Sequence, residues 1–236
     1  MRLAVRSPDS GSVPAVVKAC PLFAGADDDV LAAVGRLLRP RRFRRHEVVF
    51  HEGDPGDSLF IVASGSVKIA LVSPEGEEAI VTTLGSGDFF GELSVLDGAQ
   101  RSATASALEP TELWAIAGSM YLEVVEAEPQ LRRALLAALA GEVRGLTRHV
   151  EELHFLGLPG RLAMRLVELA RDVQGSGPGA QLPWHYTQAE LASMIGGSRQ
   201  TVSILLGDFA DEGLVRIDRD TIVIPDVDAL LRVAAR

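Results

Sequence analysis

Between Glu47 and about Ile116, short apolar stretches alternate with polar residues in the manner of β-strands. Glycines separate these stretches, and the spacing predicts a chain reversal after about 8 to 12 residues, as in an antiparallel barrel or sandwich. We therefore expect a β domain, preceded by short helices over Pro21–Leu38 with Asp27 as a helix cap. The predicted strands cover residues 47–51, 58–63, 66–72 and 79–84.

A helical period replaces the strand pattern from Pro129 onward, and it continues to Phe155. The apolar positions are spaced by 4, 3, 4 and 3 residues through Leu139, Val143, Leu146, Val150 and Leu153. This is the spacing of a coiled-coil seam, and the stripe is wider than one side of a small domain usually needs. We predict a long helix over 129–155 that pairs with a second copy of the chain, with an ordinary core helix as the alternative.

Another pair of helices is indicated near the C-terminus. Thr187 and Glu190 form the Thr-x-x-Glu pattern of a capping box, so a helix is expected to start here and to run to about Ile195. The segment Gly196–Ser198 turns the chain, and its serine caps a second helix. Two short helices joined by a glycine turn are typical of a helix-turn-helix.

Two apolar runs, 214–217 and 221–224, follow with a hairpin-sized loop between them and predict a wing. In such a unit the start of the second helix faces the major groove of DNA. Arg199 can donate two hydrogen bonds to guanine, and Gln200 can pair with the edge of adenine. A helical hairpin without nucleic acid is the alternative. The predicted DNA-contacting residues are Thr187, Ser198, Arg199, Gln200, Thr201 and Ser203.

Composition narrows the class of protein. The 236 residues are 47% hydrophobic and 23% charged, which excludes wholesale disorder. A single cysteine, Cys20, cannot form an intramolecular disulfide, and we expect it to be a packed residue rather than a redox thiol. No apolar run approaches about 18 residues, so we expect a cytoplasmic protein without a membrane span. The net charge of -9 has the wrong sign for coating nucleic acid, so any DNA contact must be local.

The arginines of segment 39–45 and the histidines are interpreted separately. Five arginines crowd the segment 39–45, and we interpret them as the solvated face of an edge strand, with an accessory contact to DNA or to an acidic partner as the alternative. The five histidines show no metal-ligand spacing, so no metal site is predicted.

A carboxylate, a guanidinium and a hydroxyl fall on one short predicted loop between strands, at Glu92, Arg101 and Ser102. Arg101 can clamp a phosphate, to which Ser102 can also donate, and Glu92 can accept from a ribose hydroxyl. An internal ion pair between Glu92 and Arg101 is the alternative.

The stretch Phe89–Thr104 resembles the phosphate-binding cassette of cyclic-nucleotide-binding domains. The chain from about Cys20 to Ile224 resembles bacterial transcription regulators of the family that contains the cyclic AMP receptor protein and the fumarate and nitrate reduction regulator. The glycines of the β region, the stretch Phe155–Ala163 and the stretch Gly197–Val202 carry the resemblance in order and spacing. It implies that the ligand-binding residues are Gly91, Glu92, Leu93, Arg101, Ser102 and Thr147.

With this resemblance we expect an α+β fold and a homodimeric, sequence-specific DNA-binding regulator under cyclic-nucleotide control, not an enzyme. Its partners would be operator DNA, a second copy of itself and RNA polymerase. The predicted parts are a flexible N-terminal tail (1–18), an antiparallel cyclic-nucleotide-binding β-roll (19–127), a dimerisation helix (128–156) and a winged helix-turn-helix domain (157–236).

The long helix departs from the family pattern. In relatives that respond to cyclic AMP, an arginine on this helix braces the cassette glutamate and a threonine–serine pair meets adenine, and by register these positions are Glu142, Leu146 and Thr147. We expect that Glu142 cannot brace Glu92, with Arg144 or Arg148 as the alternative bracing residue. Cyclic AMP is the leading effector, with another cyclic nucleotide, a ligand-independent regulator, and a haem or redox sensor on the same scaffold as alternatives.

Overall fold

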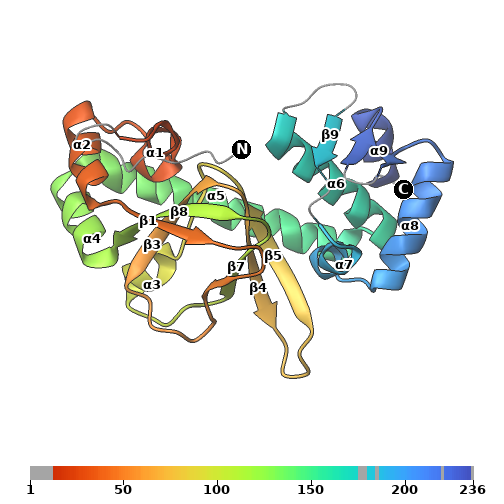
Figure 1. The fold of residues 1–236 in the computed structure, drawn as a ribbon, viewed down its shortest axis with the longest axis horizontal. Coiled ribbons are helices and arrows are strands. Elements are labelled where there is room, and N and C mark those ends of the chain that lie inside the picture. The colour runs from red at the N-terminus through yellow and green to blue at the C-terminus, as the bar shows by residue number, and fades with distance from the viewer. Residues whose placement is uncertain (1–12, 175–179, 184–185, 219–220, 235–236) are drawn as a thin grey trace. The chain divides into compact units, whose positions relative to one another are not determined.

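The computed structural model describes residues 13–174, 180–183, 186–218 and 221–234 (Figure 1). They divide into two compact units. The first extends to Leu71 and resumes over Thr82–Val143; the second contains Val72–Val81 and the chain from Arg144 onward. The predicted α+β class is confirmed, because antiparallel sheets in the first unit are followed by a long helix and by a helical domain with a small sheet.

Two four-stranded antiparallel sheets make up the β-roll. The first has the strand order β1 (Arg39–Phe43), β8 (Thr111–Ala117), β3 (Ser58–Ser64) and β6 (Phe89–Phe90). The second has the order β2 (Val48–Phe50), β7 (Thr104–Ala107), β4 (Val67–Val72) and β5 (Glu78–Leu84). The four strands predicted from the apolar stretches are all present, with ends shifted by one residue or so.

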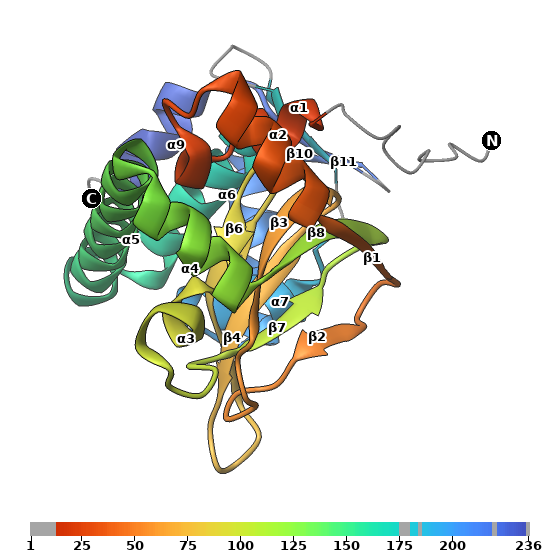
Figure 2. The same cartoon turned by 90° about the vertical axis from the view of Figure 1, so that its left-hand side faces the viewer.

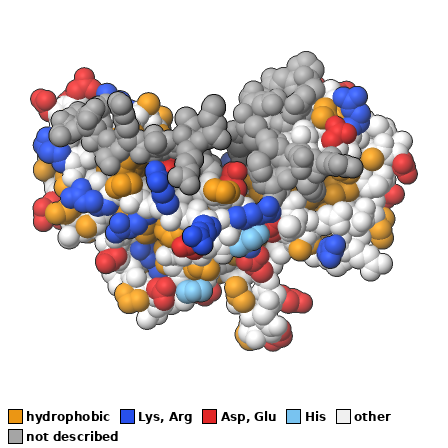
Figure 3. Space-filling model, in the orientation of Figure 1, with side chains coloured by type: hydrophobic (Ala, Val, Ile, Leu, Met, Phe, Trp, Pro, Cys, Tyr) orange, Lys and Arg blue, Asp and Glu red, His pale blue; other side chains and the backbone are white. Residues whose placement is uncertain are grey.

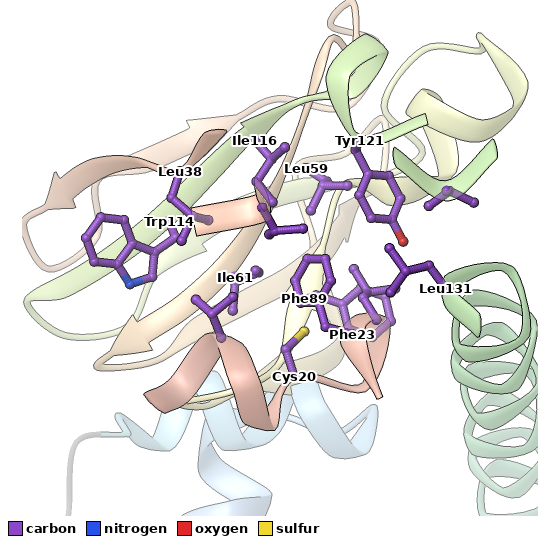
Figure 4. Close-up of a cluster of buried hydrophobic side chains, with 14 of the residues drawn as sticks. Cys20, Phe23, Leu38, Leu59, Ile61, Phe89, Trp114, Ile116, Tyr121 and Leu131 are labelled. Carbon is purple, nitrogen blue, oxygen red and sulfur yellow. The ribbon is translucent and has the colours of Figure 1, made fainter. Parts of the chain in front are cut away.

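Short helices pack on the first sheet and close the larger hydrophobic core (Figures 2 and 4). They are α1 (Ala15–Ala19), the 3₁₀ turn η1 (Pro21–Phe23), α2 (Asp28–Leu37) and α4 (Gly118–Ala127). The rings of Phe23 and Tyr121 meet edge to face at 6.2 Å, and Cys20 is fully buried beside them. The apolar face predicted for 21–38 therefore supplies core residues.

Part of the predicted tail, residues 1–18, is folded. Residues 1–12 lie outside the described part of the chain, but α1 begins at Ala15 and Val17 is fully buried in the core. Helix α1 has only five residues, too few to show a helical period in the sequence.

Strand β1 confirms the interpretation of the arginine-rich segment as an edge strand. It pairs only with β8 in its sheet, and its first four residues, Arg39–Arg42, are exposed. The Arg42 guanidinium lies 2.9 Å from the carboxylate of Glu112 on β8. Figure 3 shows basic side chains interspersed with acidic and hydrophobic ones over this unit, so the arginines do not form a field of one sign in that view.

Helix α5 (Pro129–Phe155) has 27 residues and occupies the range that the apolar spacing predicts. After it come α6 (Leu158–Gln174), β9 (Ala180–Pro183), α7 (Gln188–Ile195), α8 (Arg199–Asp211), β10 (Arg216–Ile217), β11 (Thr221–Ile224) and α9 (Val227–Ala234). Strands β10, β11 and β9 form a three-stranded antiparallel sheet, which contains the predicted wing. Helix α9 was not predicted.

Candidate functional site

The cassette begins where β6 ends. Gly91 has φ +80, a left-handed conformation that glycine adopts without strain, and it starts a helix rather than a loop. Glu92–Asp97 form helix α3, so the prediction of a continuous loop between strands was wrong. The chain then returns through Gly98 to Arg101. Helix α3 thereby fixes the direction in which Glu92 leaves the backbone.

Arg101 is buried at 5% exposure and is held by hydrogen bonds at both ends. Its backbone N–H donates to the carbonyl of Asp54 over 2.9 Å. Its Nη1 donates to the carbonyl of Gly91 over 2.7 Å and to the hydroxyl of Ser94 over 2.8 Å. Its Nη2 donates to the carbonyl of Ser58 over 2.7 Å. The guanidinium is thus fixed in one orientation by three different segments of the domain.

Aromatic rings form the floor beneath this guanidinium. The Arg101 Cζ atom lies 4.2 Å above the centre of the Phe50 ring, a cation–π contact. Phe60 and Phe90 stack at 5.3 Å, and both rings contact that of Phe50. These phenylalanines belong to the second, smaller hydrophobic cluster of the β-roll. The apolar floor and the polar rim together leave the guanidinium little freedom.

Two glycines permit the backbone to approach Arg101. A Cβ on Gly91 would lie 2.7 Å from Nη1 of Arg101. A Cβ on Gly56 would overlap the hydroxyl of Ser94 and lie 3.2 Å from the Cζ of Arg101. A larger residue at either position would displace the arginine. Gly56, which the sequence marks only as a strand separator, is therefore part of the site.

Burial and nearby carboxylates act on Arg101 in opposite directions. Burial lowers its pKa, while Asp57, Glu92 and Asp54 act in the opposite direction through their charges. Its Nε is buried and has no hydrogen-bond partner among the described residues. A buried donor without an acceptor costs free energy, and an anionic oxygen would satisfy it. The residues present therefore fit a phosphate group.

Glu92 is also buried, at 4% exposure. Glu142, on α5, is half-buried. Burial raises the pKa of Glu92, and burial together with the Glu92 charge raises the pKa of Glu142 to about 7. The expectation that Glu142 cannot brace Glu92 stays a prediction.

The other predicted ligand residues are placed as follows. Ser102 is exposed directly beside the buried Arg101, and Leu93 on α3 is 46% exposed. Thr147 is an exposed residue of α5 within the second unit. Sequence reasoning missed Ser94, Ser58 and Phe50 as partners of Arg101. Ser94 lies three residues after Gly91, within the stretch that resembles the cassette, but nothing in the sequence shows that its hydroxyl faces inward.

The helix-turn-helix has the caps that the sequence predicts. The Thr187 hydroxyl accepts from the Glu190 N–H over 3.1 Å, and the Glu190 carboxylate accepts from the Thr187 N–H over 2.7 Å. The Ser198 hydroxyl accepts from the Thr201 N–H over 3.1 Å at the start of α8. Both helices therefore begin at the caps that the sequence predicts.

The exposed side of α8 carries the side chains suited to base reading. Arg199, Gln200 and Ser203 are exposed, whereas Val202, Leu206 and Phe209 are buried on the opposite side. Ser198 and Thr187 are also exposed. Thr201 is half-buried, and its hydroxyl lies 2.8 Å from that of Ser198. Ile204, not predicted, is 56% exposed on the same helix. Residues 219–220 of the predicted wing loop lie outside the described residues.

Most of the apolar stripe of α5 is exposed in the single chain. Leu139 is half-buried, whereas Val143, Leu146 and Val150 have exposed fractions of 62%, 51% and 57%. Leu153 and Phe155 continue the stripe to the end of the helix. An apolar face of this length is unusual on the surface of a monomeric protein.

Arg161, at the start of α6, links three segments of the second unit. Its Nε donates to the carbonyl of Leu156 over 2.9 Å, and its Nη1 donates to the carbonyl of Ile195 over 3.1 Å. Its Nη2 donates to the carbonyl of Leu153. Arg161 therefore joins the end of α5 to the end of α7, a role that its position in an amphipathic helix does not reveal.

The cysteine and the histidines, which redox or metal chemistry would use, are placed as follows. Burial raises the pKa of the Cys20 thiol to about 12, which removes its thiolate at neutral pH. Nδ1 of His149 lies 4.0 Å from the Glu152 carboxylate. Within the described ranges no group of three or more metal-ligating side chains comes together, and none of the helices there is both long and apolar enough to cross a membrane.

Comparison with known proteins finds two family patterns along the chain. The pattern of the cyclic nucleotide-binding domain matches residues 40–128, and that of the Crp-like helix-turn-helix domain matches residues 160–233. A CRP-like cAMP-activated global transcriptional regulator of Mycobacterium tuberculosis is 35% identical over 212 residues, which cover 89% of this chain and 95% of the relative. The cyclic AMP receptor protein of Thermus thermophilus is 36% identical over 219 residues, covering 92% and 98%.

Solved structures have a similar fold. FixK2 from Bradyrhizobium japonicum shares the fold with a TM-score of 0.77 at 22% identity, over 84% of this chain and 98% of that one. The Thermus thermophilus catabolite activator protein is 34% identical with a TM-score of 0.52, over 91% and 98%. The matched relatives are transcription regulators rather than enzymes. This chain therefore belongs to the family of the cyclic AMP receptor protein and the fumarate and nitrate reduction regulator, as a DNA-binding transcription regulator with a cyclic nucleotide-binding domain.

Proposed function

We propose that the protein is a homodimer whose affinity for its operator is controlled by a cyclic nucleotide, with cyclic AMP as the effector. The observation that carries this proposal is the buried, oriented guanidinium of Arg101, whose Nε lacks an acceptor among the described residues. The names of the relatives from Mycobacterium tuberculosis and Thermus thermophilus favour cyclic AMP as the ligand class.

In this proposal each cassette residue has a separate task. Arg101 and the exposed hydroxyl of Ser102 hold the cyclic phosphate, as do the backbone amides near Gly91. Glu92 accepts a hydrogen bond from the ribose 2'-hydroxyl. Leu93 completes the site within the first unit. Since a cyclic phosphodiester carries one negative charge, one fixed guanidinium matches it.

The exposed stripe of α5 supports a dimer. Its residues repeat at the spacing of a coiled-coil seam, and from Val143 onward they are exposed in the single chain. A second copy of the same helix presents the same stripe, so an isologous contact covers both faces at once. We propose that residues 129–155 form this contact.

The exposed start of α8 supports sequence-specific recognition. Arg199 and Gln200 carry the donors and acceptors that distinguish guanine and adenine in the major groove. Thr187, Ser198, Thr201 and Ser203 supply hydroxyl groups for phosphates and base edges. With a net charge of -9, non-specific attraction to DNA is weak, so binding depends on two half-sites read by a dimer.

The decisive experiment measures operator affinity with and without effector. An operator is first selected from a random duplex pool, separately in the presence and absence of cyclic AMP. Its affinity is then measured by fluorescence anisotropy with cyclic AMP, with 5'-AMP as a control that lacks the cyclic phosphodiester, and without nucleotide. We expect cyclic AMP to tighten binding by at least about tenfold, a coupling typical of allosteric proteins.

Other outcomes identify the alternatives. Identical curves with and without nucleotide would establish a ligand-independent regulator. A Soret absorption band in the purified protein would favour a haem sensor, although the high pKa of Cys20 argues against a redox thiol. If cyclic GMP rather than cyclic AMP tightens operator binding, the proposed phosphate site stands and the proposed preference for adenine is wrong. We further expect RNA polymerase as a partner and a cytoplasmic location, as for a bacterial transcription regulator.

A further inference from the structure

Helix α8 of the helix-turn-helix carries a large apolar side chain on its exposed side. Ile204 is 56% exposed. Three apolar residues on the opposite side of the same helix are at most 4% exposed, namely Val202, Leu206 and Phe209. A single exposed apolar residue is common on protein surfaces and needs no explanation by itself. What distinguishes Ile204 is the face of the helix on which it lies.

Ile204 shares this face with residues that are proposed to read DNA. Helix positions separated by 3, 4 and 7 residues lie on one face. The exposed residues with this spacing are Gln200, Ser203, Ile204 and Gly207. A Cβ on Gly207 would meet nothing within 4 Å, so no described residue packs on the face at that point. The face is therefore open to a partner over about two turns of the helix.

The charges along α8 favour DNA contact by its first two turns. Arg199 is the first residue of the helix, whereas Asp208 and Asp211 are exposed in its last turn, where phosphates would repel them. Ile204 lies in the second turn, four residues or about 6 Å beyond Gln200 along the axis. Base pairs are spaced by about 3.4 Å, so Ile204 would face a base pair one or two steps from the one that Gln200 reads.

The chemistry of an isoleucine side chain limits which base it can accept. It has no hydrogen-bonding group, so against the amino group of cytosine or the O6 atom of guanine it would leave a desolvated polar atom without a partner. The C5-methyl group of thymine is the apolar group that base pairs present in the major groove. A β-branched side chain in a helix also has one strongly preferred χ1 rotamer, so contact with a base costs it little entropy.

We propose that Ile204 is a specificity-determining residue that contacts the C5-methyl group of one thymine in each half-site of the operator. The inference rests on the proposed recognition of DNA by α8. It adds an apolar contact to the hydrogen bonds that Arg199 and Gln200 would make. Water leaves both the methyl group and the Ile204 side chain in this contact, which favours thymine, and cytosine is disfavoured because its amino group finds no acceptor there.

Operators that contain deoxyuridine test the proposal, because deoxyuridine lacks only the C5-methyl group of thymidine and keeps its base pairing. The operator selected with the full-length protein is prepared with deoxyuridine at one thymine position at a time, in both half-sites. We expect one position at which the replacement weakens binding about fifteenfold, since burial of one methyl group is worth about fourfold in each half-site. Fluorescence anisotropy at fixed salt measures the affinities.

Variants of Ile204 connect the effect to this side chain. Ile204→Ala should remove the difference between thymine and deoxyuridine at that position, which a double-mutant cycle measures. Ile204→Val keeps a branched apolar side chain and should keep most of the difference. Met120→Ala removes a side chain of similar exposure, 46%, from α4 in the first unit and should discriminate as wild type does. Because Ile204 is more than half exposed, Ile204→Ala should unfold thermally as wild type does.

The outcomes separate this inference from the proposed function. Loss of affinity at one thymine position, absent in Ile204→Ala, establishes the contact. Suppose instead that the selected operator depends on Arg199 but has no thymine in its half-sites, tolerates deoxyuridine throughout, or responds equally in wild type and Ile204→Ala. The role of Ile204 is then wrong, and recognition by α8 stands. If no sequence is enriched from the random pool with or without nucleotide, recognition by α8 and the role of Ile204 both fail.

Discussion

Arg161 donates a hydrogen bond to the carbonyl oxygen of Ile195 over 3.1 Å, and so attaches the start of α6 to the last residue of α7. The same guanidinium bonds the carbonyls of Leu153 and Leu156 at the end of α5 and just beyond it. These carbonyls have no partner within a helix, because a helix leaves its last four C=O groups unpaired. One side chain therefore connects the long helix to the helix-turn-helix.

Replacement of Arg161 by alanine should loosen this connection. We expect a loss of about 2 to 4 kcal/mol in the free energy of unfolding, since several hydrogen bonds from a charged donor are lost together. Arg161→Lys should recover part of the loss, because an ammonium cannot reach three carbonyls with the geometry of a guanidinium. Urea denaturation measures both. Arg232→Ala, which removes an exposed arginine of α9, serves as control and should change stability by less than about 0.5 kcal/mol.

The two serines of the cassette should behave differently. Ser94→Ala removes a hydrogen-bond partner of buried Arg101, so we expect a loss of about 1 kcal/mol in stability together with weaker cyclic AMP binding. Ser102→Ala removes an exposed hydroxyl, so stability should be unchanged while affinity for cyclic AMP falls about tenfold. Thermal unfolding and calorimetry on both variants check this. Equal effects of the two substitutions on stability would contradict the assignment.

A charged substitution tests whether the apolar stripe of α5 forms the dimer contact. Leu146→Glu places a carboxylate in the seam, and against a second copy it would be buried and unpaired, so we expect the variant to be monomeric in sedimentation experiments. Arg148→Glu places the same residue on the opposite side of the helix and should leave the dimer intact. A wild-type protein that sediments as a monomer at all concentrations would remove the basis of this prediction.

Arg199 should carry sequence preference. Arg199→Ala is expected to weaken binding to the selected operator by about tenfold to a hundredfold, the range for loss of a bidentate contact with guanine, and to leave binding to unrelated duplex nearly unchanged. Anisotropy titrations at fixed salt measure both. Arg36→Ala, at an exposed arginine of α2 in the first unit, should bind the operator as wild type does. A uniform loss on all sequences would assign Arg199 to phosphate contact instead.

Features that depend on neighbours in sequence were predictable. The capping box joins Thr187 to Glu190, and the second cap joins Ser198 to Thr201, so each contact spans three residues and leaves a local pattern. The same holds for the helix over 129–155, whose apolar spacing is regular. Helix α3 was missed because its six residues complete fewer than two turns and give no period.

Contacts between distant segments were not predictable. Ser58 lies 43 residues from Arg101 in sequence, and no alternation of polar and apolar residues shows that its carbonyl accepts from that side chain. Likewise the sequence does not show that Glu92 on α3 is buried, or that burial raises the pKa of Glu142 on α5 to about 7. Chemistry of this kind depends on desolvation, which only the folded chain defines.

The fixed guanidinium of Arg101 also has an entropic consequence. A free arginine side chain loses about 1.5 to 2 kcal/mol of rotamer entropy when it is ordered, and in this protein that loss occurs during folding rather than during binding. The phosphate thus meets a receptor whose key donor is already immobile, which favours affinity and penalises the stability of the unliganded domain. Sensitivity to the signal and robustness of the β-roll are therefore in competition at this residue.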